Sequence, residues 1–196
     1  MAIDQKKILE LRQRTGAGIN DISAALQQSG GDAEQAIVLL RERGAIKASK
    51  KTAERSTGVG MIESYVHANG RVGVLLELRC ESDFVARTDD FRTLAHDVAM
   101  QVAATGAAYL RPEDVPADVV EAERRIAREQ LRDSGKPAAM LDKIIEGKLQ
   151  KWYAESCLLQ QPFIKDESLT VQQLIDRAVA KLGEKIEVGK FTRLTA

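Results

Sequence analysis

The sequence has few of the residues that usually carry chemistry. Only 4% of its 196 residues are aromatic, and it holds two cysteines and two histidines. Neither histidine, His67 or His96, lies at metal-ligand spacing from a cysteine or from the other histidine, so no metal site is predicted. The sequence also lacks a Gly-x-x-x-x-Gly-Lys-Ser/Thr loop. We therefore expect the chain to hold no nucleotide of its own and no other cofactor.

The chain has no excess of charge of either sign. Lys and Arg total 29, Asp and Glu total 29, and the formal net charge is zero. Because nucleic-acid-binding domains usually carry a basic excess, direct nucleic-acid binding is not expected. No stretch approaches the roughly 18 apolar residues of a membrane span, and the N-terminal residues show no signal-peptide pattern. These features predict a cytoplasmic protein that does not enter a membrane.

The composition that remains is typical of a folded, soluble chain, with 44% apolar and 30% charged residues. Cys80 and Cys157 lie far apart and are each flanked by apolar residues. We interpret both as reduced, buried packing residues. A cysteine-dependent enzyme would need one exposed and activated thiol, and Cys80 is the better candidate for that alternative.

The N-terminal part predicts a small helical domain. Residues 4–43 carry apolar residues at helical spacing in three short runs separated by glycine-containing turns. The third run opens with Asp32 and has Gln35 at capping-box spacing, and Gly44 is a natural residue to end it. We therefore expect a three-helix domain over 1–46 and a small, basic linker over 47–56.

The remainder, 57–196, predicts a mixed core. Asn69-Gly70 separates two β-type runs, which indicates a hairpin of strands 58–67 and 71–79. Thr88 can cap a following amphipathic helix. Two further helices, 117–133 and 138–159, form a helical arm, and alternation from Lys185 onward indicates a last strand. The predicted fold class is α+β: an N-terminal three-helix bundle, then helices packed on a small antiparallel three-stranded sheet.

The junction between the hairpin and the next helix breaks the usual turn chemistry. Ser82 and Asp83 suit a turn, whereas Phe84 is large and apolar. Phe84 either folds back into the core or is presented by a rigid scaffold to a partner. The sequence leaves both interpretations open.

Four spaced motifs then carry a resemblance to a known family. They run through nearly the whole chain: Leu11-Arg-Gln-Arg-Thr-Gly-Ala-Gly-Ile-Asn-Asp21, Leu40-Arg-Glu-Arg-Gly-Ala-Ile-Lys-Ala-Ser-Lys-Lys51, Cys80-Glu-Ser-Asp-Phe-Val-Ala-Arg87 and Leu158-Leu-Gln-Gln-Pro-Phe-Ile-Lys-Asp166. In this order they resemble the short form of the elongation factor Ts family. Its signature loop usually has Thr where this chain has Ser82, and Met is common where this chain has Asn20.

The resemblance implies a fold and a function. It implies a ubiquitin-associated-like N-terminal bundle and a guanine-nucleotide exchange factor that binds elongation factor Tu in its GDP form. The loop matching Ser82, Asp83, Phe84 and Val85 would disturb the Mg²⁺ site of elongation factor Tu. A weaker partner contact is implied around Leu11, Ile19 and Asn20. No bond chemistry and no metal or cofactor are implied, and short members form homodimers, which we expect through the core sheet.

Two other function classes compete with this interpretation. A ubiquitin-associated-type adaptor would use residues 1–44 and leave the core without a role. A cysteine-dependent enzyme would depend on Cys80. The neutral charge balance opposes a third class, nucleic-acid binding.

Overall fold

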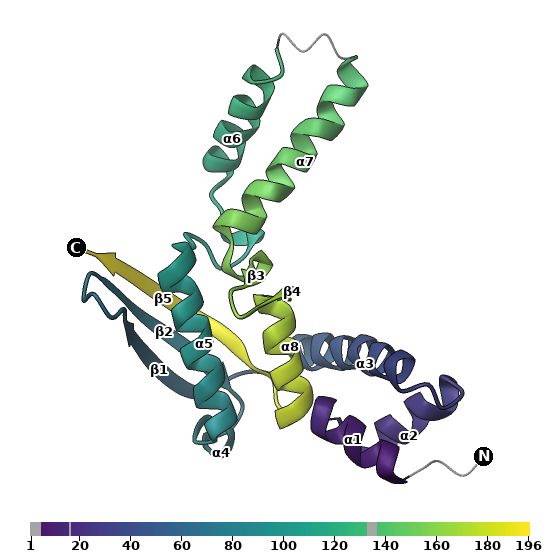
Figure 1. Cartoon of the computed structure of the whole chain (residues 1–196). Coiled ribbons are helices and arrows are strands. Elements are labelled where there is room, and N and C mark those ends of the chain that lie inside the picture. The colour runs from purple at the N-terminus through teal and green to yellow at the C-terminus, as the bar shows by residue number, and fades with distance from the viewer. Residues whose placement is uncertain (1–4, 16, 133–136) are drawn as a thin grey trace. The chain divides into compact units, whose positions relative to one another are not determined.

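The computed structural model describes residues 5–15, 17–132 and 137–196 (Figure 1). Its main elements in chain order are α1 (Gln5–Thr15), α2 (Ile19–Gln28), α3 (Ala33–Glu54), β1 (Val59–Val66), β2 (Val72–Cys80), α4 (Asp83–Ala86), α5 (Asp89–Thr105), α6 (Ala117–Glu129), α7 (Ala138–Ser156), β3 (Pro162–Phe163), β4 (Asp166–Thr170), α8 (Val171–Leu182) and β5 (Glu187–Thr195). Short 3-10 turns lie at Pro112–Asp114 and Leu158–Gln160. The predicted α+β class is confirmed.

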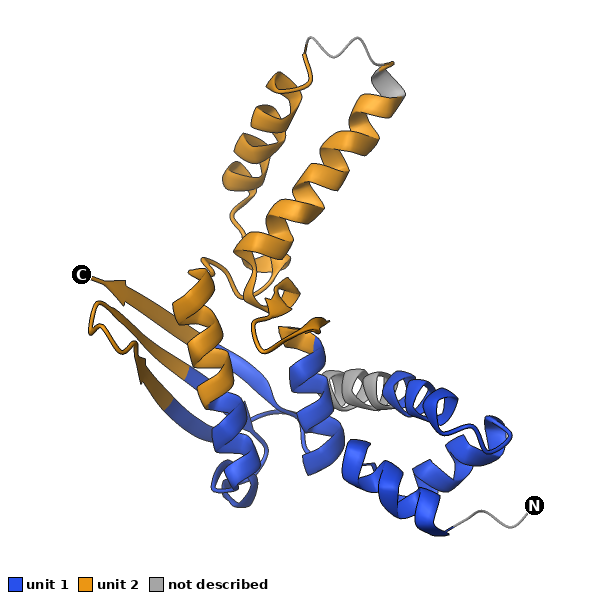
Figure 2. Cartoon of the chain, viewed as in Figure 1, with its two compact units in different colours: residues 1–62, 77–95, 173–189 blue, residues 63–76, 96–172, 190–196 orange. Residues whose placement is uncertain are grey.

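The chain divides into two compact units (Figure 2). The first contains residues 1–62, 77–95 and 173–189, and the second contains 63–76, 96–172 and 190–196. Within the described residues, no helix has the length and apolarity that a membrane crossing requires.

Helices α1 to α3 enclose a small core of their own. Its buried side chains are Leu11, Ile22, Ala25, Leu26, Ala36, Ile37 and Leu40. The predicted cap of α3 is confirmed, because the Gln35 amide donates to Asp32 Oδ1 at 3.0 Å. The three predicted helices are therefore present, packed around a core built from their helical-period apolar residues.

The predicted end of the third helix at Gly44 is wrong. Helix α3 continues to Glu54, so most of the predicted linker over 47–56 is helical. The physical reason lies in the sequence that follows Gly44, which contains Ala, Lys and Glu and no proline. One glycine costs a helix about 1 kcal/mol relative to alanine, which good helix formers on both sides can offset.

The predicted three-stranded sheet is confirmed, with strand order β1-β2-β5. The hairpin turn also forms as expected, since Gly70 has φ of 67° and its amide donates to the His67 carbonyl at 2.8 Å. Strand β2 alternates strictly toward its end, where Leu76, Leu78 and Cys80 are fully buried. This alternation fixes which side chains face the core at the point where β2 leads into the 82–88 segment.

The arm helices α6 and α7 pack on each other, and Figure 1 shows them side by side. Their shared core is small and consists of buried Ala127, Ile145 and Leu149 with half-buried Leu131 and Tyr153 beside it. Beyond the arm, the β3–β4 hairpin was not predicted. Its strands are too short to show a period in the sequence, with Phe163 paired to Asp166.

Candidate functional site

Phe84 is the most exposed large apolar side chain in the described part of the chain, at 81%. It lies shortly after β2, with residues 81–83 between them. The last residue of β2, Cys80, is fully buried, and Val85, which follows Phe84, is only 4% exposed. The structure thus decides between the two interpretations of Phe84. The ring does not fold back into the core, and buried residues on both sides present it at the surface.

Local hydrogen bonds explain why the chain takes this shape. Ser82 has an extended backbone and caps the one-turn helix α4, with its Oγ accepting from the Val85 amide at 3.4 Å. At the other end, Thr88 Oγ1 donates to the Val85 carbonyl at 2.8 Å and accepts from the Phe91 amide at 3.3 Å. The sequence predicted Thr88 as a cap, and this is confirmed. Phe84 therefore stands on a short helical turn that is fixed at both ends.

A third set of contacts comes from a distant part of the sequence. Glu184 accepts two hydrogen bonds from Ser82, one from its amide at 3.0 Å and one from its hydroxyl at 2.6 Å. The next residue, Lys185, donates its backbone amide to Glu81. Sequence reasoning missed Glu184, because 102 residues separate it from Ser82 and no local pattern marks it.

Phe84 lines a surface hollow together with polar and charged residues. Asp83, Phe84, Arg87 and Thr88 line a hollow of about 450 Å³. Asp83 and Arg87 are exposed, so one carboxylate and one guanidinium flank the exposed ring. An apolar ring with charges beside it suits docking into a partner's pocket rather than holding a small molecule.

Val85, predicted with the loop, is buried and offers a partner no side-chain surface. Its position makes it the anchor of the one-turn helix. Leu11 is likewise buried, at 1% exposure, and belongs to the core of the N-terminal bundle. Ile19, at 50% exposure, and Asn20 are both open to solvent at the start of α2. Binding of a partner by any of these residues stays a prediction.

The geometry disfavours a thiol enzyme. Both cysteines are buried, as predicted. Burial raises the pKa of the Cys80 thiol and raises that of Cys157 to about 11, so both are protonated near neutral pH. Among the described residues, no cluster of three His, Cys, Asp or Glu side chains is arranged to hold a metal ion.

The two histidines serve other contacts. His96 Nδ1 lies 3.1 Å from Glu63 Oε1, and the Tyr65 hydroxyl lies 3.1 Å from His67 Nδ1. The Tyr65 ring also meets the His96 ring edge-on, with centroids 5.6 Å apart. These are ordinary polar and aromatic contacts at the protein surface.

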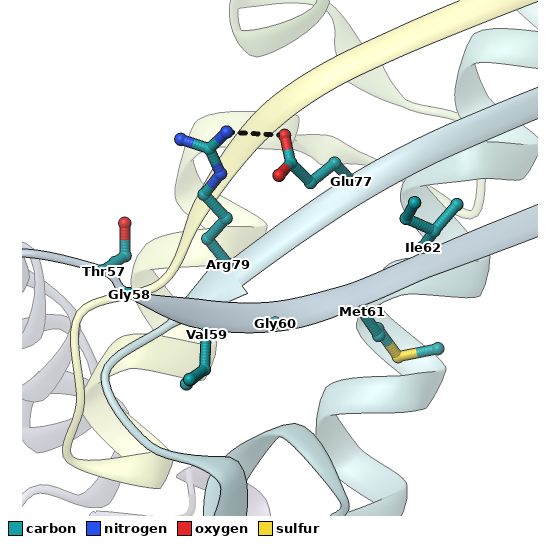
Figure 3. A pocket seen from close by; sticks show the side chains of 8 residues that line it. All are labelled: Thr57, Gly58, Val59, Gly60, Met61, Ile62, Glu77 and Arg79. Atoms are coloured by element: carbon teal, nitrogen blue, oxygen red, sulfur yellow. Dashed lines mark hydrogen bonds and ion pairs between the residues drawn. The ribbon is translucent and has the colours of Figure 1, made fainter.

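A second hollow, of about 340 Å³, lies along the start of β1 (Figure 3). Its lining includes Gly60, Ile62, Glu77 and Arg79, with the last two joined by an ion pair of 2.8 Å. Gly60 is required there because a Cβ would lie 2.2 Å from the Leu78 carbonyl oxygen. Ile62 is 70% exposed beside this hollow. The hollow contains an apolar side chain and a neutralised charge pair, which suits contact with another protein surface.

Comparison with known proteins identifies the class of protein to which this chain belongs. A family model described as elongation factor TS matches residues 30–196. The chain is 53% identical to elongation factor Ts of Fervidobacterium nodosum over 99% of this chain and 98% of that one. It is 51% identical to elongation factor Ts of Thermosipho melanesiensis, over 98% of each chain.

A longer relative, elongation factor Ts of Desulforamulus reducens, is 50% identical over 97% of this chain and 88% of its own. Matches of this length define the class as translation elongation factors. The chain belongs to the elongation factor Ts family. Membership implies guanine-nucleotide exchange on elongation factor Tu in protein biosynthesis.

Proposed function

We propose that this chain binds elongation factor Tu in its GDP form and promotes GDP release by pressing Phe84 and Asp83 against the Mg²⁺ and phosphate site. The observation that carries the proposal is the 81% exposure of Phe84 on a helical turn fixed at both ends. Leaving an aromatic ring in water forgoes about 1.5–3 kcal/mol of burial. A partner pocket recovers that free energy, so the exposed ring favours association.

The physical basis of exchange is coupling between two ligands. Mg²⁺ and its ligands bridge the nucleotide phosphates to a GTPase, so displacing them removes a large share of nucleotide affinity. The exchange factor and GDP then weaken each other's binding by the same factor. No bond is made or broken on this chain, and the protein acts as an exchange factor rather than as a catalyst of bond chemistry.

Two further contacts belong to the proposal. Ile19 and Asn20, exposed at the start of α2, add a second and weaker contact with elongation factor Tu. A homodimer forms through the core sheet, whose strand β1 presents Ile62 beside the hollow of Figure 3. The protein works in the cytoplasm without direct contact with nucleic acid or membrane.

The test is release of a fluorescent GDP analogue from cognate elongation factor Tu, followed at substoichiometric amounts of this protein. We expect each molecule to discharge many complexes, and we expect excess Mg²⁺ to reduce the acceleration. No acceleration at any Mg²⁺ concentration would refute the function and favour the adaptor. An acceleration that does not respond to Mg²⁺ would keep exchange but refute the Mg²⁺ mechanism.

A further inference from the structure

We infer that Glu184 is a positioning residue for nucleotide exchange: its carboxylate holds Ser82, and through Ser82 the turn that presents Phe84. The inference rests on the proposed function and adds to it a residue far from the signature loop. The two hydrogen bonds from Ser82 to Glu184 are called the 82–184 clasp below.

The clasp uses both hydrogen-bond donors of Ser82. The amide and the hydroxyl each donate to a different carboxylate oxygen of Glu184, at 3.0 and 2.6 Å. Hydrogen bonds to an ionised acceptor are shorter and stronger than those between neutral groups. Because the hydroxyl hydrogen is used on Glu184, the oxygen remains free to accept from the Val85 amide, which caps α4.

Glu184 is itself held in place. Helix α8 ends at Leu182, and Gly183 has φ of 82°, a conformation that side chains other than glycine rarely adopt. The Gly183 amide closes the helix by donating to the Val179 carbonyl at 3.0 Å. On the far side, the Lys185 amide donates to Glu81. The acceptor of the clasp therefore sits on a closed helix end rather than on a free loop.

The clasp acts at the N-terminal end of the turn. Toward its C-terminal end, the turn is held by buried Val85 and by the Thr88 hydroxyl. Toward its N-terminal end, the Ser82 carbonyl accepts from the Ala86 amide at 3.2 Å and weakly from Cys80 Sγ at 3.2 Å, and Glu81 accepts from the Lys185 amide. Without Glu184, the start of α4 would lose its two strongest hydrogen bonds, and Phe84 would sample more orientations.

The first measurement uses the full chain alone. Amide hydrogen exchange of a peptide covering residues 81–88 is compared between wild type, Glu184→Ala and Glu184→Gln. We expect the Ala variant to exchange this peptide at least about tenfold faster while the β2 amides keep their protection. The Gln variant retains an acceptor oxygen and gains a donor for the Ser82 hydroxyl, so it should stay close to wild type. Unchanged exchange in Glu184→Ala would overturn the inference, whatever the partner does.

The second measurement links the clasp to Phe84. In GDP release from elongation factor Tu, we expect Glu184→Ala to lower the acceleration about tenfold, since a displacement of about 1 Å can cost on the order of 100-fold in a positioned reaction. In the Phe84→Ala background, the same change should have a much smaller effect, because only Asp83 on the same turn can then transmit it. Equal effects in both backgrounds would show that Glu184 acts elsewhere. Glu167→Ala, which changes an exposed glutamate outside the clasp, is the matched control and should match wild type. If wild type itself does not accelerate GDP release, the result counts against the proposed function alone, and the hydrogen-exchange measurement still decides the inference.

Discussion

At the scale of a single residue, Cys157 makes the stability of the protein depend on pH, because folding raises the pKa of its thiol from 9.0 to about 11. Burial is the main cause, and the charges of Glu113 and Asp114 add to it. Between these two pH values the unfolded chain releases the thiol proton while the folded chain keeps it. Ionisation of the thiol therefore stabilises the unfolded state relative to the folded state, and the free energy of unfolding falls as pH rises from about 9 to 11.

We test this with urea unfolding of wild type and Cys157→Ala at several pH values. The variant lacks this titration, so the difference in unfolding free energy between the two proteins should shrink across that pH range. A constant difference from pH 8 to pH 11 would contradict the assignment.

Gln161 is a second residue whose role is set by burial. At 2% exposure, its amide accepts from Gln101 and Thr105 and donates to the Glu155 carbonyl at 2.7 Å. Gln161→Leu would remove these bonds and leave the Glu155 carbonyl without this donor, at about 1–3 kcal/mol for an unsatisfied group. Gln101 and Thr105 would keep their bonds to the Pro162 and Gln101 carbonyls. We expect a loss of about 1–3 kcal/mol in chemical denaturation, whereas the exposed Gln150→Leu should change stability by less than about 0.5 kcal/mol. Equal effects of the two changes would refute a structural role for the buried amide pair.

At the scale of elements, the length of helix α3 predicts how a substitution at Gly44 changes stability. Because the helix continues through this residue to Glu54, alanine there removes a helix-breaking residue. We expect Gly44→Ala to stabilise the protein by about 0.5–1 kcal/mol and to preserve its helical circular dichroism. If the helix ended at Gly44 in a left-handed conformation, the same change would lower the melting temperature.

The elements show which parts of the fold were predictable. Segments with a long period or a strong turn signal were predicted correctly, such as the hairpin at Asn69-Gly70 and helix α5 with its Thr88 cap. Gly44 does not mark the end of α3, because the helix propensity of the residues on both sides outweighs the signal of a C-terminal glycine. The exposure of Phe84 depends on the packing of its neighbours, which the local sequence does not determine. Glu184 was missed altogether because tertiary contacts leave no local trace in a single sequence.

At the scale of the whole molecule, the proposed homodimer gives a further prediction. Ile62 is 70% exposed on edge strand β1, beside a hollow that also contains the Glu77–Arg79 ion pair. Burying a new carboxylate there without a partner would be costly. We expect Ile62→Asp to shift the protein to monomer in sedimentation velocity, and Ile126→Asp, on the arm at 47% exposure, to leave the assembly unchanged. A dimer that survives Ile62→Asp would place the interface elsewhere.

Contacts of Arg55, the residue after α3, connect it to the segments on either side of the Phe84 turn. Arg55 pairs with Glu81 at 3.1 Å, and Lys185 donates its ammonium to the Arg55 carbonyl at 2.9 Å. These contacts tie the residue that follows α3 to the same segments that form the 82–184 clasp. An ion pair near the surface, such as Arg55–Glu81, contributes little stability by itself.

The central claim is that the exposed ring of Phe84 promotes GDP release from elongation factor Tu. The most direct test is to measure that release in the presence of the Phe84→Ala variant. Release of a fluorescent GDP analogue from cognate elongation factor Tu is compared for wild type, Phe84→Ala and Met140→Ala, whose side chain is 51% exposed. We predict that Phe84→Ala stays folded and loses about tenfold or more of the acceleration, a transition-state loss of at least about 1.4 kcal/mol, while Met140→Ala matches wild type. A folded Phe84→Ala that accelerates release as well as wild type would contradict the account.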